Sequence, residues 1–157
     1  MRKLAFLALF LVGLAGCATA PAPYGNFSKN TDQANDKKVA DDVVKKLVLL
    51  YPPARTRFDL QHATPDFFGS YLVESMRAKG YAVNEPKAAA GATSTGSSSP
   101  EKTATPGLPL SYIVDQGNGS DLYRVTVLIN RQQSLDRAYQ VAQDGAIYPA
   151  GSWVRKE

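Results

Sequence analysis

Apolar residues recur every three or four positions between residues 36 and 50, which places them on one face of an α-helix. The opposite face carries two rows in which aspartate and lysine alternate four positions apart. Such rows are typical of a solvated helix surface, so the charge run predicts no site. Pro52 and Pro53 end the predicted helix. Its apolar face comprises Val39, Ala40, Val43, Val44, Leu47 and Leu50.

Two short strands are predicted on either side of a second helix. Phe58 and Leu60 alternate with Arg57 and Asp59, which predicts a strand over residues 56–61. A further strand is expected over residues 81–84. A strand, a helix and a strand in so short a stretch predict a βαβ unit, whose two strands are parallel with a right-handed crossover.

The helix between these strands is predicted over residues 65–79. Thr64 is its candidate N-cap, and Pro65 suits the first helical position because that position needs no N–H donor. Asp66 suits the positive end of the helix dipole. Gly80 is expected to end the helix in a left-handed conformation.

Residues 85–107 form an insert of low complexity, rich in alanine, glycine, serine and threonine. The segment has almost nothing to bury and is expected to be disordered. The sequence before it lacks enough strands to close a core of its own. We therefore expect one domain, over residues 36–157, that the insert interrupts.

After the insert, apolar and polar residues alternate in four segments joined by short turns. Strands are expected at 110–115, 123–129 and 135–141, followed by a last strand that Pro149 and Gly151 interrupt. Trp153 belongs to this last strand, where core packing is favoured over exposure for docking. The fold class is therefore α+β: two helices packed on a mixed sheet, with the βαβ unit followed by a four-stranded antiparallel meander.

The amino terminus has the pattern of a bacterial lipoprotein signal. Arg2 and Lys3 precede an apolar run of about 10 residues, and the sequence Leu-Ala-Gly-Cys ends at Cys17. This lipobox predicts that residues 1–16 are removed and that Cys17 is acylated, since a thiolate is the nucleophile that accepts the lipid. Cys17 is the only cysteine, so no disulfide forms within one mature chain.

Two alternatives to a lipoprotein signal are an ordinary secreted protein, with Cys17 placed by accident, and a transmembrane anchor. The run is short for a span of about 30 Å of hydrocarbon. Ala18, rather than aspartate, follows the cysteine, which favours the outer membrane, facing the periplasm, in a Gram-negative host. Since Arg2 and Lys3 leave with the signal, the formal charge falls by two from +4 to +2. Direct nucleic-acid binding is not expected, because the sequence has no arginine-rich or aromatic-basic run.

Residues 17–35 read as a lipidated, flexible tether, because prolines, glycine and small polar residues dominate them. Tyr24 and Phe27 are the two aromatic residues in this segment. They are expected to dock either onto their own domain or onto a partner, as short extended segments often do.

No group of residues in the sequence has the spacing of a catalytic, cofactor or metal site. His62 is the only histidine, and no serine, cysteine or carboxylate forms a recognisable motif with it. A metal site is not expected, because the sequence has no second histidine and its one cysteine is predicted to carry the lipid. We therefore expect a protein that is not an enzyme and that needs no cofactor beyond the covalent lipid on Cys17.

Short motifs in a defined order cover most of the sequence outside the insert. They are Tyr24-Gly25-Asn26-Phe27, Leu50-Tyr51-Pro52-Pro53-Ala54-Arg55-Thr56-Arg57-Phe58, Thr64-Pro65-Asp66 with Phe68-Gly69, Leu72-Val73-Glu74-Ser75, Lys79-Gly80-Tyr81-Ala82, Gly107-Leu108-Pro109-Leu110, Leu122-Tyr123-Arg124-Val125 and Pro149-Ala150-Gly151-Ser152-Trp153-Val154-Arg155-Lys156-Glu157. In this order they resemble the TrbH family of conjugal-transfer lipoproteins.

This resemblance implies a component of a mating-pair-formation apparatus, a type IV secretion system that passes plasmid DNA between bacteria. It implies a lipid anchor in the outer membrane, with the core channel subunits of that system as partners. Only Cys17 carries over as a functional position, because the family offers no catalytic residues. The expected function is structural or assembly support of the apparatus. The alternative is a generic outer-membrane lipoprotein that acts as a binding module in another envelope assembly.

Overall fold

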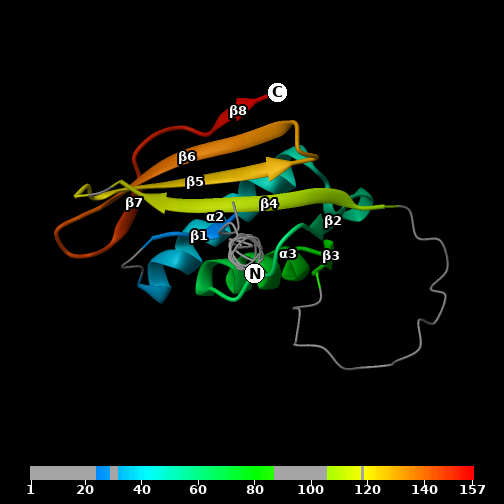
Figure 1. Cartoon of the computed structure of the whole chain (residues 1–157), viewed down its shortest axis with the longest axis horizontal. Coiled ribbons are helices and arrows are strands. Elements are labelled where there is room, and N and C mark those ends of the chain that lie inside the picture. The colour runs from blue at the N-terminus through cyan, green and yellow to red at the C-terminus, as the bar shows by residue number, and fades with distance from the viewer. Residues whose placement is uncertain (1–23, 29–31, 87–105, 118) are drawn as a thin grey trace, which may run out of the picture.

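The computed structural model describes residues 24–28, 32–86, 106–117 and 119–157 of the 157-residue chain. In these residues a mixed eight-stranded sheet carries two α-helices (Figure 1). The helices are α2 (Gln33–Leu50) and α3 (Phe67–Ala78), with a 3-10 turn η2 (Pro53–Arg55). The strands are β1 (Gly25–Asn26), β2 (Arg57–Leu60), β3 (Ala82–Asn84), β4 (Leu108–Gln116), β5 (Leu122–Ile129), β6 (Gln133–Val141), β7 (Ile147–Pro149) and β8 (Val154–Lys156). The predicted α+β class is confirmed.

Helix α2 begins three residues earlier than predicted, at Gln33 rather than at residue 36. Asp32 is the N-cap, and its carboxylate accepts a hydrogen bond from the backbone N–H of Ala34 at 3.1 Å. Asn35, predicted to lie in the tether, is buried in the first turn of the helix. Its side-chain amide donates to the carbonyl of Gly145 at 2.8 Å and accepts from the N–H of Ile147 at 3.2 Å. The helix thus starts where its side chains contact the turn after β6.

The predicted cap of helix α3 was wrong by two residues. Asp66, not Thr64, is the N-cap, since its carboxylate accepts from the N–H of Gly69 at 2.9 Å. Pro65 therefore lies before the helix. The predicted end is confirmed: Gly80 has a φ of 88°, and the N–H groups of Gly80 and Tyr81 return to the carbonyls of Arg77 and Met76.

The order of strands in the sheet is β3-β2-β4-β5-β6-β7. Strands β2 and β3 are parallel, as predicted for the βαβ unit. Strand β4 is also parallel to β2, and β4, β5, β6 and β7 form the predicted antiparallel meander. Between β3 and β4 lies the predicted insert, of which residues 87–105 are outside the described residues.

The last predicted strand is in fact two strands. Strands β7 and β8 pair with different ends of β6. Pro149 ends β7 because proline has no N–H for the ladder. Trp153 lies between the two strands, half-buried against the core, with the guanidinium of Arg137 5.6 Å from its ring centroid. Trp153 was predicted to belong to the core, and it packs against the core without being fully buried.

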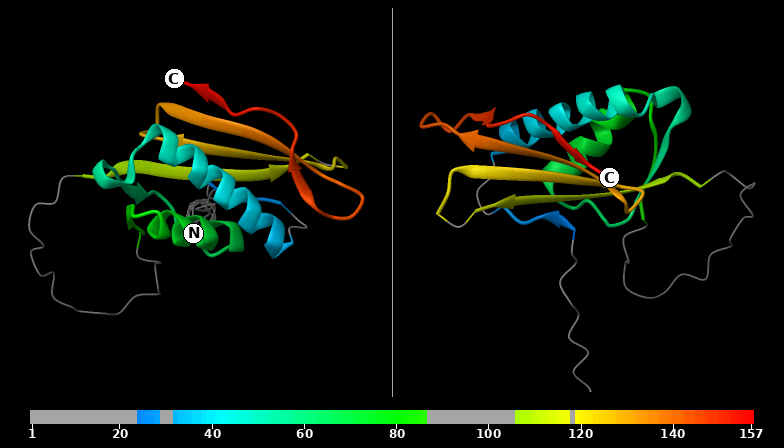
Figure 2. Two further views of the ribbon diagram at one scale, coloured as in Figure 1. Left: turned by 180° about the vertical axis from the view of Figure 1, so that it is seen from behind. Right: turned by 90° about the horizontal axis from the view of Figure 1, so that it is seen from above.

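The two helices cover one face of the sheet (Figure 2). The core lies between the helices and the sheet. It is formed by side chains of α2 and α3 and by the alternate residues of β2, β4, β5 and β6 that point toward the helices. We call the opposite face the open face. It is formed by the intervening residues of those strands, and no described helix covers it. It carries Arg57, Asp59, Ile113, Asp115, Leu122, Arg124, Thr126, Leu128, Asp136 and Ala138, together with Tyr148, Val154 and Lys156 from β7 and β8.

Candidate functional site

The predicted signal and the acylated position lie outside the described residues, so the anchor at Cys17 stays a prediction. Among the described helices, none is long and apolar enough to cross a membrane.

Tyr24 and Phe27 flank strand β1, in the segment predicted to be a flexible tether whose two aromatic residues dock onto their own domain or onto a partner. The part of this segment over residues 24–28 is not flexible tether but part of the sheet, because β1 pairs in parallel with Ile113 and Val114 of β4, and the N–H of Phe27 donates to the carbonyl of Val114 at 2.7 Å. The ring of Tyr24 stacks on His62 with 5.7 Å between centroids. Tyr24 therefore docks onto its own domain, whereas Phe27 keeps half of its surface exposed. A partner for Phe27 stays a prediction.

His62 fills the gap between two strands that share one edge of β4. Strand β2 pairs with β4 up to Leu110, and β1 pairs with it from Ile113 onward. Between them, the backbone N–H of Tyr112 donates to His62 Nε2 at 3.3 Å. The other ring nitrogen, Nδ1, donates to the carbonyl of Ala63 at 3.0 Å, the tautomer that these partners require.

The role of His62 is therefore to complete a sheet edge. Its ring lies between the rings of Tyr24 and Tyr112, the latter at 4.6 Å between centroids. Sequence reasoning missed this role, and the available signal was a lone histidine directly after a predicted strand. His62 therefore joins the amino-terminal segment to the domain, through its contacts with Tyr24 and Tyr112.

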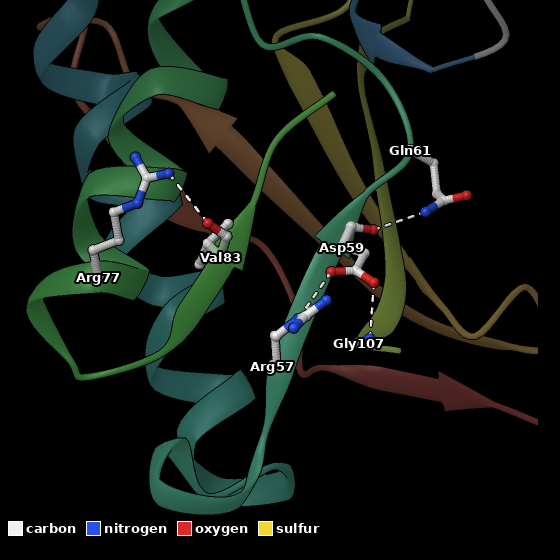
Figure 3. Close-up of polar contacts among 6 residues, drawn as sticks. All are labelled: Arg57, Asp59, Gln61, Arg77, Val83 and Gly107. Atoms are coloured by element: carbon white, nitrogen blue, oxygen red, sulfur yellow. Dashed lines mark hydrogen bonds and ion pairs between the residues drawn. The ribbon is translucent and has the colours of Figure 1, made fainter. Parts of the chain in front are cut away.

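Asp59 organises the entry into β4 (Figure 3). Its carboxylate accepts from Nε of Arg57 at 3.3 Å and from the N–H of Gly107 at 2.8 Å, and its carbonyl accepts from the amide of Gln61 at 2.9 Å. A Cβ on Gly107 would lie 2.7 Å from Asp59 Oδ1 and 3.0 Å from the carbonyl oxygen of Arg57, so a larger residue would displace the Asp59 carboxylate. Asp59 thus secures the start of the strand that follows the insert.

At the other flank of the insert, Arg77 of α3 holds strand β3. Its guanidinium donates to the carbonyl of Val83 at 3.2 Å (Figure 3). It also pairs with Glu85 at 2.7 Å. Both groups of contacts therefore belong to the frame of the sheet, and neither aligns a nucleophile with a base.

Tyrosines of the sheet reach aspartates of the helix layer. The hydroxyl of Tyr112 donates to Asp66 at 2.6 Å, and that of Tyr139 donates to Asp42 at 2.7 Å. Burial, the hydrogen bond and the aspartate charge each raise the pKa of both phenols above the ordinary value, in that order of importance. These phenols therefore act as neutral donors that tie the two layers together.

Tyr81 is a third buried phenol, and its raised pKa predicts how the stability of the domain changes at alkaline pH. Burial raises the pKa of Tyr81 from 10.0 to about 12, and its hydroxyl donates to the carbonyl of Tyr51 at 2.5 Å. A raised folded-state pKa gives stability that is complete below pH 10 and is lost as the pH rises toward 12. We expect Tyr81→Phe to lower the free energy of unfolding by about 1 kcal/mol at pH 8.

The gap between wild type and Tyr81→Phe should shrink at pH 11, because only the wild type ionises this phenol on unfolding. Urea unfolding at both pH values measures the change, with Tyr148→Phe, which removes an exposed hydroxyl, as the matched control. A gap that widens at pH 11 would contradict the assigned role of burial.

No cluster of three or more histidine, cysteine, aspartate or glutamate side chains suited to a metal ion occurs in the described part of the chain. The residues singled out by sequence and structure instead join strands, helices and the amino-terminal segment. They define a small α+β domain whose distinctive polar contacts are architectural.

Comparison with known protein families identifies the chain as a component of conjugal transfer. The family model described as conjugal transfer protein TrbH matches residues 21–157, so it covers every described residue. The chain belongs to the TrbH family. No curated protein and no solved structure matches the chain.

Proposed function

We propose that this protein is a lipid-anchored structural component of a conjugation apparatus, held at the outer membrane by a lipid on Cys17. The observation that carries the proposal is the TrbH family match over residues 21–157, which begins four positions after Cys17 of the sequence Leu-Ala-Gly-Cys. A lipid with two or more acyl chains supports stable anchoring, because each buried methylene contributes about 0.8 kcal/mol.

The domain then serves as a binding module for the core channel subunits and has no reaction of its own. The resemblance to TrbH-like lipoproteins supports this role, as do the architectural contacts of the described residues. Ala18 supports the outer membrane as the site of the anchor.

A plasmid-transfer assay tests this function. We expect deletion of the gene to lower the transfer frequency, and the wild-type gene to restore it. Cys17→Ser should fail to restore transfer, because the thiol that accepts the lipid is gone. Membrane fractionation should find the wild-type protein in the outer-membrane fraction and the Cys17→Ser protein outside it. Wild-type transfer frequency in the deletion strain would disprove the proposal.

A further inference from the structure

In each ion pair of the open face, the basic side chain is more exposed to solvent than its acidic partner. The exposed fractions of the side chains are 62% for Arg124 against 33% for Asp115, and 72% for Lys156 against 20% for Asp136. At the other end of the sheet they are 36% for Arg57 and 22% for Asp59. The positive charges are therefore the more accessible ones on this face.

Two of these acids are also held in place by neutral donors of the sheet. Asp136 accepts from the hydroxyls of Thr126 at 2.7 Å and Ser134 at 2.8 Å, whereas Lys156 lies 3.9 Å away. Asp59 similarly accepts from the N–H of Gly107. Because the acids have other partners, the bases of these pairs are able to turn toward an external anion at little cost.

Apolar side chains lie among these bases. Leu122, Tyr148 and Val154 belong to the open face, and each exposes about half of its surface. Phe27, just after β1, is exposed to a similar extent. Exposed bases mixed with apolar side chains are the composition that suits an anionic lipid surface, where the charges meet headgroups and the apolar groups enter the interface.

The amino-terminal segment joins the domain at the edge of β4, beside the open face. Seen from above, the helices lie on one side of the sheet and β1 lies toward the other (Figure 2). Tyr24 is seven positions after Cys17, a stretch that spans at most about 25 Å when fully extended. A lipid on Cys17 therefore keeps the domain close to the bilayer.

We propose that the open face docks onto anionic phospholipid headgroups, so that the helical layer points away from the membrane. The proposal rests on the anchoring of Cys17 proposed above. Docking fixes the orientation of the domain and leaves α2 and α3 accessible to other subunits.

Fluorescence quenching on vesicles tests the orientation. Acylation occupies the thiol of Cys17, so an added cysteine is the single free thiol of the mature lipoprotein. Ala138→Cys places a fluorophore on the exposed part of β6 in the open face, and Ala78→Cys places it on the exposed side of α3. Vesicles of phosphatidylethanolamine and phosphatidylglycerol carry a nitroxide quencher on the headgroup, and vesicles of phosphatidylcholine provide the neutral comparison.

We expect the label at position 138 to be quenched strongly on the anionic vesicles and the label at position 78 to remain bright. Lys156→Gln should lower the ratio of docked to undocked domain about fivefold at low salt, since each surface cation contributes about 1 kcal/mol at an anionic membrane. Lys45→Gln, which removes an exposed charge from α2, should change nothing.

Flotation of the same samples separates this inference from the proposed function. A protein that floats with the vesicles but shows equal quenching at both positions, or none at 138, overturns the docked orientation alone. If the label at 138 becomes shielded only when channel subunits are added, the open face binds protein and the lipid proposal is wrong. A lipoprotein that does not float disproves anchoring at Cys17, and the inference fails with it.

Discussion

Gly69→Ala is expected to lower the free energy of unfolding by about 2 kcal/mol, although alanine normally stabilises a helix. Gly69 lies in the first turn of α3, where the helix meets β4. A Cβ at this position would lie 2.1 Å from the hydroxyl oxygen of Tyr112 and 2.8 Å from Cβ of Thr64. To make room, Tyr112 must move away from Asp66, the acceptor of its hydroxyl. Urea unfolding measures the loss, with Glu74→Ala on the exposed side of α3 as the control.

Removing the hydroxyl group should relieve part of this strain. In a Tyr112→Phe background, we expect Gly69→Ala to cost about 1 kcal/mol less than in the wild type, because the nearest contact is gone. A Gly69→Ala protein more stable than the wild type would contradict the close approach of α3 to β4, since that result is typical of a helical glycine with free space around it.

The sequence predicted best those features that depend on periodic patterns. The apolar faces of both helices, the βαβ unit and the meander follow from spacing within short segments, and the structure has all of them. The helix starts were predicted less well. Both Thr64 and Asp66 are able to cap a helix, and the choice between them depends on Tyr112, which lies 46 positions later and donates to Asp66.

The functional features were harder to predict because they arise from contacts across the chain. No local pattern indicates that Gly25 and Asn26 add to the edge of β4, or that His62 lies between β1 and β2 there. The charge arrangement of the open face likewise requires the register of strands β4, β5, β6 and β8. By contrast, Cys17 is defined by the sequence alone, through the short motif that precedes it.

Two side chains of the sheet meet at Asp42 of α2. Its carboxylate accepts from Arg137 at 2.7 Å and from the hydroxyl of Tyr139 at 2.7 Å, both from β6. Arg137 also donates to the carbonyl of Gly151 at 2.9 Å and covers the ring of Trp153. One carboxylate therefore links the helix layer, the sheet and the segment between β7 and β8.

Asp42→Ala is expected to lower the free energy of unfolding by about 3 kcal/mol, because it leaves a partly buried guanidinium and a buried phenol without their acceptor. Asp42→Asn should cost less, since its amide oxygen still accepts a hydrogen bond from Tyr139. Trp153 is the only tryptophan, so its fluorescence reports directly on the release of Arg137 from the segment between β7 and β8.

Two comparisons separate the loss of the link from the general cost of altering α2. Lys45→Ala removes an exposed charge one turn further along the helix and should change stability by less than about 0.5 kcal/mol. In a Tyr139→Phe background, Asp42→Ala should cost about 1 kcal/mol less than in the wild type, because one of its two donors is already absent. Equal costs in both backgrounds would show that Asp42 and Tyr139 do not stabilise the domain together.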